Sequence, residues 1–455
     1  MMATRVPGRR STIQQYKKRW LSYPCSTTKA VQFSLDNLSH IRKDLYGDQE
    51  NVSHFNSAGD SPMPRPVLEV VKNHLDLEAR IGGYKAAEEV ESLRSEVYGK
   101  VAELIGAKSV KEIALVESAT VGWTRGFYSL AKAKLKPGSV LLTCEAEYAA
   151  QWVAMKHVCR DYGAKLVTIP SDPVLGEIDL EQLPKLLHDH NVGMVCVTHI
   201  PTNGGLVNPV EQVGQVIKSY NEKNKDSIVY IVDACQSVGQ WPVSVKSIHC
   251  DMLSACGRKF LRGPRGTGFL YMKQTLAESI EPSHMDHYCA QVELDPADTS
   301  SDPTVVFRQG AGRFEFWEAS IASQLGFGAA IDYAQSIGVK AIQTRVTMLA
   351  DRLREGLANL PNVSVHDIGT VKCAIVSFSA EGISTLYLKT KLESKGHCLG
   401  VVPSSSTPID SARRRLPGFI LRASVHYFCL EKEIDTLVED VENLVMIEKE
   451  KVSPV

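Results

Sequence analysis

The spacing of apolar residues between about residues 51 and 310 alternates between helical and strand periods. Val90, Leu93, Val97 and Val101 recur every three or four residues and mark one face of a helix. Short apolar runs of strand length follow, and helical segments separate them: Ile113–Val116, Val140–Thr143, Lys165–Ile169, Met194–Thr198 and Ile228–Val232. Strands that alternate with helices predict an α/β fold, in which helices cover both faces of a mostly parallel sheet.

The pattern changes near Ala311. A long helical face is predicted over residues 339–360, strand-like segments follow it, and a last helix carries apolar residues from 434 to 444. This order predicts a smaller α+β domain. We therefore expect an N-terminal arm at residues 1–50, a large domain at 51–315 and a small C-terminal domain at 316–455. The polar, serine-rich stretch 403–416 is predicted to be a loop.

The length and composition are those of a soluble globular protein. The chain has 455 residues, of which 44% are hydrophobic and 23% are charged, and no apolar run approaches the roughly 18 residues of a membrane span. Lys and Arg total 51 against 52 Asp and Glu, so the net charge is -1; this balance gives no support to nucleic-acid or membrane binding. The 11 cysteines form no CxxC pairs, which predicts free thiols in a reducing compartment.

The first 35 residues are basic, because no acidic residue precedes Asp36. A start that is rich in Arg and Ser and poor in acidic residues is typical of an organelle transit peptide. The other interpretation of the same residues is a basic arm that leads into a helix around Ile13–Leu21. We therefore expect a cytoplasmic protein, with mitochondrial import as the alternative.

The segment from residue 228 to residue 271 carries the most specific chemistry. Its buried strand is followed by Asp233, and a carboxylate at the carboxyl end of a strand in an open parallel sheet lies where ligands bind. Lys259 comes next, beside Arg258 and before a turn that contains Gly263, Pro264, Gly266 and Gly268. Glycines at such a turn let the backbone bend closely around whatever the lysine holds.

This arrangement resembles the class V aminotransferase group of fold-type-I enzymes, which use pyridoxal 5'-phosphate (PLP). The group carries an Asp-x-x-Gln pair after a strand, then Ser-x-x-Gly-x-Lys before a Gly-Pro-x-Gly turn. The matching residues of this chain are Asp233, Gln236, Ser254, Gly257, Lys259, Gly263, Pro264 and Gly266. The resemblance extends from about residue 50 to residue 447.

The resemblance implies roles for three of these residues in PLP chemistry. Lys259 would form the Schiff base with the cofactor aldehyde and would then act as general acid and base. Asp233 would pair with the pyridinium nitrogen, so that the ring accepts electrons from the substrate. Gln236 would hydrogen-bond the ring hydroxyl. Without Lys259 downstream, Asp233 would be interpreted as a helix cap and Gln236 as a solvent-facing residue.

The same resemblance implies contacts with the cofactor phosphate. Ala119 and Thr120 open a helix after a strand, where donors to a phosphate gather, although Thr120 is equally suited to cap the helix. Ser254 and Arg258 occupy two other phosphate-contacting positions. Cys256 replaces a serine that is common in the group, so the phosphate contact from that position is in doubt.

Three more residues complete the expected site. Tyr148 follows Glu147 where the group places an aromatic ring that stacks on the cofactor, and its alternative role is that of a core aromatic. Asn203 follows a strand and, with its neighbour Thr202 as the alternative, is a candidate for contact with the cofactor or the substrate. Arg422, in a strand of the small domain, would bind the substrate α-carboxylate with two hydrogen bonds.

The reaction is chosen by the pocket, because PLP supports desulfuration, transamination, epimerisation and C–S bond cleavage alike. A desulfurase needs a nucleophilic cysteine on the loop before the carboxylate-binding arginine, and residues 403–416 contain none. Desulfuration is therefore disfavoured. The segments 77–87, 199–208, 258–268 and 313–317 look like those of hercynylcysteine sulfoxide lyases, the last enzymes of ergothioneine biosynthesis, and of isopenicillin N epimerase-like proteins.

We therefore expect a PLP-dependent C–S lyase that converts a cysteine conjugate, or its sulfoxide, to pyruvate and ammonia. An aminotransferase or an epimerase acting on another amino acid is the alternative. The resemblance also implies a homodimer whose active site is shared between subunits. The group's usual threonine contact to the partner subunit is not expected here, because Phe316, Trp317 and Glu318 follow Glu315 where the group has x-Gly-Thr-Pro, in which x is any residue.

Overall fold

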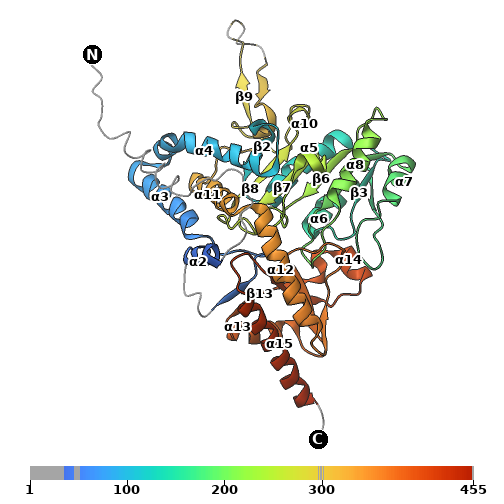
Figure 1. Ribbon diagram of the computed structural model, residues 1–455. Helices are drawn as coiled ribbons and strands as arrows, with labels where there is room; N and C mark the ends of the chain where they lie inside the picture. Colours follow the sequence, from blue (N-terminus) through green and yellow to red (C-terminus); the bar gives the residue numbers. More distant parts are fainter. Residues whose placement is uncertain (1–34, 46–51, 296, 298–299, 301, 453–455) are drawn as a thin grey trace.

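The computed structural model describes residues 35–45, 52–295, 297, 300 and 302–452 (Figure 1). The predicted helix around Ile13–Leu21 and the basic stretch that suggested a transit peptide lie outside these residues. The helices are α2 (Leu35–Lys43), α3 (Arg65–Ile81), α4 (Gly83–Ile105), α5 (Ala119–Lys134), α6 (Ala149–Tyr162), α7 (Gln182–Asp189), α8 (Val210–Asn221), α9 (Val245–Ile248), α10 (Gln274–Glu278), α11 (Ile321–Ile337), α12 (Val339–Ala358), α13 (Thr385–Ser394), α14 (Pro408–Arg413) and α15 (Glu431–Val452).

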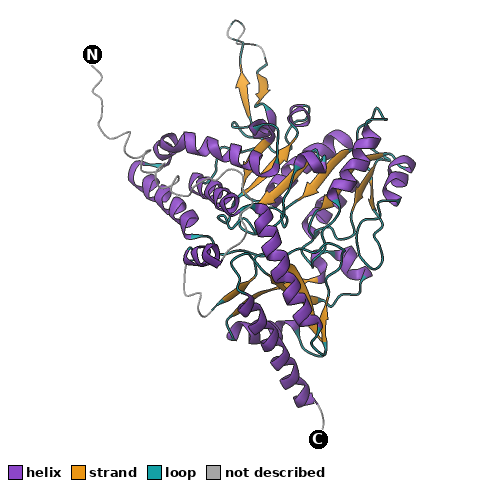
Figure 2. Ribbon diagram, in the orientation of Figure 1, coloured by secondary structure: helices purple, strands orange, loops and turns teal. Residues whose placement is uncertain are grey.

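Seven strands between residues 113 and 272 form one sheet, in the order β2-β8-β7-β6-β5-β3-β4. Every neighbouring pair is parallel except the two that involve β8, which is antiparallel to both β2 and β7. The strands are β2 (Ile113–Val116), β3 (Val140–Thr143), β4 (Lys165–Thr168), β5 (Val192–Thr198), β6 (Val229–Asp233), β7 (Met252–Cys256) and β8 (Gly268–Met272). The predicted α/β fold with a mostly parallel sheet is confirmed (Figure 2).

Both faces of this sheet are buried, because successive side chains of a strand point to opposite sides. In β3, Leu141 packs with the buried residues of α5 and α6. Its neighbours Val140 and Leu142 pack in a separate cluster that includes apolar residues of α7 and α8. A sheet covered on both sides explains why its strands appear in the sequence as continuous apolar runs.

A second, five-stranded sheet has the order β1-β13-β14-β12-β11. Its strands are β1 (Ser53–Phe55), β11 (Val363–Val365), β12 (Ile375–Ala380), β13 (His397–Pro403) and β14 (Phe419–Ser424). β1 pairs in parallel with β13, so a segment from the beginning of the described chain completes the C-terminal sheet. The domain limits at residues 50 and 315 stay a prediction.

Two local predictions need correction or addition. The stretch 403–416, predicted to be a loop, contains a 3-10 turn at Ser404–Ser406 and the short helix α14. The first residue of α14, Pro408, has a fixed backbone angle that suits the start of a helix. The prediction of a loop rested on the many serines of this stretch and overlooked this proline. The antiparallel pair β9 (Ala290–Glu293) and β10 (Thr304–Phe307) projects from the body of the molecule in Figure 1, and the sequence pattern gave no indication of it.

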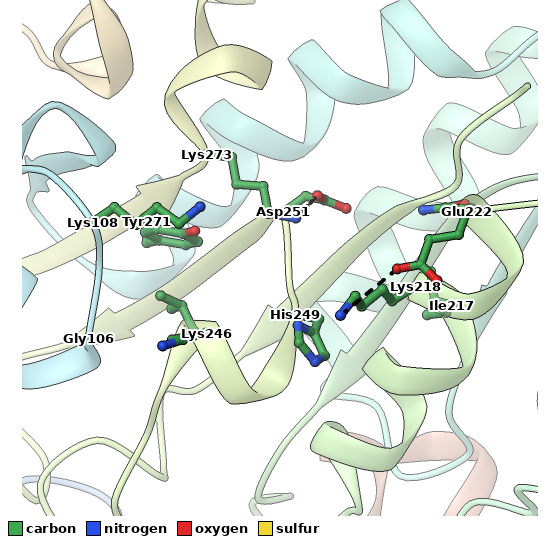
Figure 3. A pocket seen from close by; sticks show the side chains of 12 residues that line it. Gly106, Lys108, Ile217, Lys218, Glu222, Lys246, His249, Asp251, Tyr271 and Lys273 are labelled. Carbon is green, nitrogen blue, oxygen red and sulfur yellow. Dashed lines mark hydrogen bonds and ion pairs between the residues drawn. The ribbon is translucent and has the colours of Figure 1, made fainter.

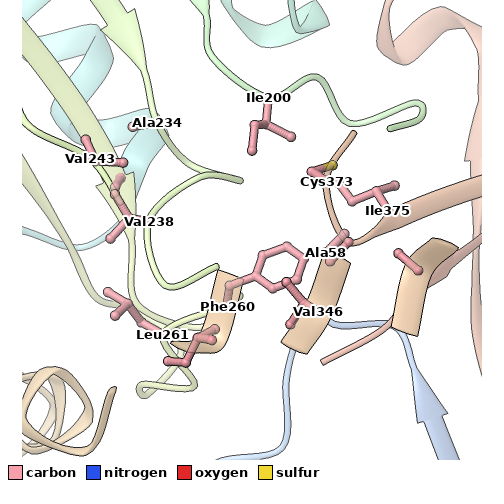
Figure 4. Close-up of a cluster of buried hydrophobic side chains, with 14 of the residues drawn as sticks. Ala58, Ile200, Ala234, Val238, Val243, Phe260, Leu261, Val346, Cys373 and Ile375 are labelled. Atoms are coloured by element: carbon pink, nitrogen blue, oxygen red, sulfur yellow. The ribbon is translucent and has the colours of Figure 1, made fainter. Parts of the chain in front are cut away.

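Apolar side chains from both halves of the chain pack between the two sheets (Figure 4). Phe260 and Leu261, which follow the end of β7, share this cluster with Val346 of α12 and Ile375 of β12. The packing fixes the small sheet against the carboxyl ends of the large sheet's strands. Among the described residues, no helix combines the length and apolar composition that crossing a membrane requires.

Candidate active site

A cavity of about 270 Å³ lies at the carboxyl ends of β5, β6 and β7, where open α/β sheets bind their ligands. Segments of both sheets line it, including Val401 and Val402 of β13. Eight of the predicted site residues line this cavity: Ala119, Thr120, Tyr148, Asp233, Gln236, Arg258, Lys259 and Arg422. The fold therefore brings together residues that are separated by up to about 300 positions in the sequence.

Lys259 lies three residues after the end of β7, within the electrostatic influence of the Asp233 carboxylate and of two thiols. Burial disfavours its ammonium form, but Cys235, Cys256 and Asp233 together raise the pKa of Lys259 above its ordinary value. Before a cofactor is bound, Lys259 is therefore a cation that the neighbouring acidic groups stabilise. Such an amine has to lose its proton before it can attack the carbonyl group of a ligand.

The turn that follows Lys259 is anchored to the small domain by Arg262. This arginine has a left-handed backbone (φ 61°) and is fully buried. Its Nε donates to the carbonyl of Pro62 over 2.8 Å, and its Nη1 donates to the hydroxyl of Tyr427 over 3.0 Å. Its guanidinium also lies 4.7 Å from the ring centre of Phe428. These contacts hold the Gly-rich turn, and with it Lys259, against the small domain.

The carboxylate of Asp233, at the end of β6, is buried and accepts two hydrogen bonds. The Nε2 of Gln151 donates to Oδ2 over 2.6 Å, and the backbone N–H of Cys235 donates to Oδ1 over 2.7 Å. Burial raises the pKa of Asp233 to about 7 in spite of these donors and of nearby Lys259. Gln151 was missing from the sequence prediction, because a glutamine within helix α6 carries no motif of its own.

Gln236 lines the cavity, and only one of the two polar atoms of its side-chain amide is hydrogen-bonded. Its Nε2 donates to the carbonyl of Ala58 over 3.1 Å, whereas its Oε1 is buried and has no hydrogen-bond partner in the described structure. A buried polar atom without a partner is costly unless a ligand or a water satisfies it. The Oε1 of Gln236 is therefore suited to accept from a hydroxyl group on a bound ligand.

The first turn of α5 closes one end of the cavity. Ser118 caps this helix by accepting a hydrogen bond from the backbone N–H of Val121 over 3.1 Å, and Ala119 and Thr120 of the first turn line the cavity. The capping role considered for Thr120 thus belongs to Ser118. Free N–H groups and the positive end of the helix dipole make this turn suitable for a phosphate. Arg258 lines the same cavity and hydrogen-bonds the carbonyl of Gly59.

Tyr148 precedes α6 on a segment fixed by Glu147. The Glu147 carboxylate accepts hydrogen bonds from the backbone N–H of Tyr148, from Thr143 at the end of β3 and from Thr198 at the end of β5. Burial raises the pKa of Glu147 to about 7. The Tyr148 side chain is 38% exposed, so it lines the mouth of the cavity and the alternative of a core aromatic is wrong.

Arg422 reaches the cavity from β14 with no carboxylate beside it among the described residues. Its Nη1 donates to the hydroxyl of Thr202 over 2.6 Å and to the carbonyl of Thr202 over 3.3 Å, and its Nε has no partner. Burial lowers the pKa of Arg422 to about 10. An arginine that is buried without an anion is prepared to bind one that a ligand brings.

Two predicted site residues do not line the cavity. Asn203 is buried and its Nδ2 donates to the hydroxyl of Thr407 over 2.8 Å, which ties the segment after β5 to the start of α14. Its neighbour Thr202 lines the cavity in its place, an offset of one residue that a motif without a fixed spacing does not reveal. Ser254 is fully buried within β7, and its Oγ has no partner. Cys256, two residues later on the same face of the strand, lines the cavity instead.

A larger cavity of about 460 Å³ lies at the opposite end of β7 (Figure 3). Lysines dominate its rim, but two of them are paired: Lys218 with Glu222 at 3.9 Å and Lys273 with Asp251 at 2.7 Å. None of the predicted cofactor residues lines it. The smaller cavity, with its lysine, carboxylate and unpaired arginine, is therefore the candidate active site.

The family of the chain follows from a comparison over most of its length. Residues 53–437 match the model of the family described as aminotransferase class-V. The chain belongs to the class-V aminotransferase family. It is a PLP-dependent enzyme, and the family, the cofactor and the enzyme class predicted from the sequence are confirmed. The residues around the cavity fit this cofactor, because the buried Oε1 of Gln236 lacks a partner, the first turn of α5 is open and Lys259 is at hand.

The relatives are proteins of sulfur metabolism. A probable cysteine desulfurase of Synechocystis sp. is 27% identical over 396 residues, which cover 86% of this chain and 90% of that protein. The structure of a cysteine desulfurase from Thermococcus onnurineus NA1 has a TM-score of 0.81 at 24% identity and covers 92% of this chain and 100% of its own. The cystine C–S lyase C-DES, in a complex with cysteine persulfide, has a TM-score of 0.71 at 20% identity and covers 86% and 98% of the two chains.

These relatives correct the expectation about the subgroup within the family. They are cysteine desulfurases and a cystine lyase, so they give no support to the expected membership in the sulfoxide lyases of ergothioneine biosynthesis. Of the four segments that suggested this subgroup, 199–208 and 258–268 follow β5 and β7 next to the cavity, whereas 77–87 joins α3 to α4 and 313–317 lies between β10 and α11. The short motifs therefore identified the family and not the subgroup.

Proposed function

We propose that this protein cleaves the Cβ–S bond of a cysteine-type amino acid with PLP as its cofactor. The observation that carries the proposal is the grouping of Lys259, Asp233 and the unpaired Arg422 in one cavity of a class-V chain. The curated relatives, which are cysteine desulfurases at 24–27% identity, support a substrate of this class. A pathway leading to ergothioneine is not part of the proposal.

Cofactor binding is assigned to residues at the ends of several elements. Asp233 would hold a proton on the ring nitrogen, and Gln236 would accept from the ring hydroxyl. The first turn of α5, at Ala119 and Thr120, and the guanidinium of Arg258 would bind the phosphate. Tyr148, at the mouth, would cover the exposed ring face. When bound, PLP supplies an electron sink for the pair of electrons released at the substrate Cα.

Substrate recognition is assigned to Arg422. Among the described residues its Nε has no partner and its Nη1 bonds only to Thr202, so the guanidinium keeps donors for a carboxylate that enters the cavity. Such a contact fixes the α-carboxylate and thereby orients the Cα–H bond. Lys259 would accept the proton from Cα and would return it to a carbon or to a leaving sulfur. The negative groups around it favour the cation that this proton transfer creates.

The fate of the sulfur separates two versions of this function. The segment between β13 and β14, residues 404–418, contains no cysteine, so it offers no thiol to accept sulfur from the substrate. This observation favours release of the sulfur-containing group by β-elimination, with pyruvate and ammonia as the other products. The relatives favour desulfuration, which yields alanine, and this is the second candidate.

The test is a product assay on purified enzyme given L-cysteine, L-cystine and cysteine S-conjugates with their sulfoxides, without any keto acid. Pyruvate formed in an amount equal to the thiol or sulfide released supports elimination, and alanine formed with sulfide in the presence of a reducing thiol supports desulfuration. Turnover that depends strictly on a keto-acid acceptor, or racemisation without bond cleavage, would make the protein an aminotransferase or an epimerase and would contradict the proposal. A homodimer with a shared active site and a cytoplasmic location belong to the same proposal.

A further inference from the structure

Two thiols touch each other inside the cavity proposed to bind PLP. Cys235 lies in the turn after β6, Cys256 is the last residue of β7, and both line the cavity with Lys259. Their sulfur atoms are 3.3 Å apart. Among the described residues they are the two cysteines that line this cavity, and the proposed mechanism uses neither.

The strand register explains the contact. β6 and β7 are parallel neighbours in which Asp233, the last residue of β6, is opposite Ser254, and Cys235 in the turn that follows lies against Cys256. The sulfur atoms, which are 3.3 Å apart, therefore have to approach only to the roughly 2.05 Å of a disulfide bond.

The surroundings of the pair favour one reactive thiolate. The hydrogen bond donated by the Cys235 thiol lowers the pKa of Cys256 to about 6, and the charges of Lys259 and Arg258 act in the same direction against burial. Elsewhere in the sheet, burial and the Glu147 carboxylate raise the pKa of Cys144 and of Cys196. The thiol pair thus differs from the structural cysteines of the core in geometry and in charge.

We propose that Cys235 and Cys256 form a dithiol that a hydroperoxide oxidises to a disulfide, and that this disulfide closes the cavity to PLP. The claim that the disulfide closes the cavity to PLP rests on the proposed assignment of this cavity to the cofactor. The Cys256 thiolate attacks one peroxide oxygen, which gives a sulfenic acid and, after protonation, water. The Cys235 sulfur then attacks the sulfenic sulfur and expels a second water. Two thiols and one hydrogen peroxide become one disulfide and two waters, so the peroxide accepts two electrons and each sulfur loses one.

The position of the pair explains the consequence for the cofactor. Cys235 lies between Asp233 and Gln236 in sequence, and Cys256 precedes Lys259 by three residues. Disulfide formation draws the sulfurs together to about 2.05 Å and removes the thiol groups that influence the charge of Lys259. Cofactor bound against Asp233 and Lys259 would shield the same thiols from peroxide. Oxidation and cofactor binding should therefore exclude each other.

The experiment compares the apo and PLP-loaded protein after treatment with hydrogen peroxide. Remaining thiols are alkylated, peptides are mapped by mass spectrometry, and uptake of PLP is measured from the visible absorbance of bound cofactor. We expect a Cys235–Cys256 disulfide in the apo protein, loss of PLP uptake and its recovery with dithiothreitol. The PLP-loaded protein should form the disulfide at least about tenfold more slowly.

Three variants make the result specific. In Cys256→Ser, which restores the residue common in the family, and in Cys235→Ala, PLP uptake after peroxide should equal uptake before it. Cys398→Ser, a half-buried cysteine on β13, should lose PLP uptake on oxidation as the unaltered protein does. A peptide map without the Cys235–Cys256 link, or oxidised protein that takes up PLP unchanged, would overturn the proposal. A reduced protein that takes up no PLP contradicts the proposed function instead, and the peptide map still reports on the dithiol.

Discussion

The Nε2 of Gln151 donates a 2.6 Å hydrogen bond to Oδ2 of Asp233 across 82 positions of sequence. Both side chains are buried, so this contact stabilises the charged form of the carboxylate that is proposed to hold the cofactor ring nitrogen. Only one other hydrogen bond to this carboxylate is described, from the backbone N–H of Cys235. The amide of α6 is therefore a positioning group for Asp233.

Replacing Gln151 by alanine should weaken PLP binding. The Asp233 carboxylate would lose one of its two donors, and such a loss costs about 1–2 kcal/mol, which is roughly a 5- to 30-fold rise in the Kd for PLP. Titration of apo protein with PLP, followed by absorbance, measures it. Gln215→Ala, an exposed glutamine on α8, is the matched control. Equal affinities for the two variants would show that Gln151 does not support Asp233.

The stability of the apo protein should fall as pH rises through neutrality. Burial raises the pKa of Asp233 to about 7 in the folded protein, whereas an unfolded aspartate titrates near 3.9. The folded state therefore binds its proton more tightly, so this contribution is fully present below about pH 4 and is lost as pH rises through about 7.

The size of this effect is measured by replacing the carboxyl group. Asp233→Asn should have little effect on unfolding by urea at pH 4 and should stabilise the apo protein at pH 8 by roughly 2–4 kcal/mol relative to the unaltered chain. The exposed Asp172 is the control, because backbone N–H donors lower its pKa and Asp172→Asn should give no gain at pH 8. A difference between Asp233→Asn and the unaltered chain that does not change with pH would refute the linkage.

Replacing Arg422 by alanine should mainly weaken substrate binding. Hydrogen bonds from a charged donor to a carboxylate contribute about 1.5–3 kcal/mol, so kcat/KM should fall roughly 10- to 100-fold, mostly through KM. Arg413→Ala, which removes an arginine paired with Glu145 outside the cavity wall, is the control. Unchanged KM in Arg422→Ala would remove this residue from substrate recognition.

Replacing Lys259 by alanine should abolish turnover and the covalent attachment of PLP. A positioned proton-transfer group contributes about 100- to 10,000-fold to a rate, and the loss of the nucleophilic amine adds to this effect. Borohydride treatment followed by peptide mapping should place PLP on Lys259 in the unaltered protein. Lys273→Ala, at the opposite end of the large sheet, should retain both properties. PLP attached to another lysine would refute the assignment.

The sequence determined the elements and the identity of the chemistry. Apolar runs located β2 and β3 at their observed residues, because strands buried on both faces impose a local composition that needs no knowledge of the partner strand. Asp233 and Gln236 lie at the end of β6 and just after it, and Lys259 lies just after β7. Because their spacings are fixed within one short segment of the chain, a single motif identifies all three. The prediction of a loop over all of 403–416 was wrong, because a helix of a single turn leaves almost no periodic pattern in the sequence.

The tertiary structure decided which distant groups support this chemistry. Thr202 and Arg422 are 220 positions apart in sequence and meet only because the small sheet packs against the strand ends of the large one. Gln151 reaches Asp233 through the placement of α6, and Cys235, in the turn after β6, meets Cys256 because β6 and β7 are neighbours in the sheet. Contacts of this kind depend on the relative positions of whole elements, which are set by packing over the entire core. The residues that perform the chemistry can therefore be identified from the sequence. The residues that position them or shift their pKa values can be identified only from the contacts of the folded chain.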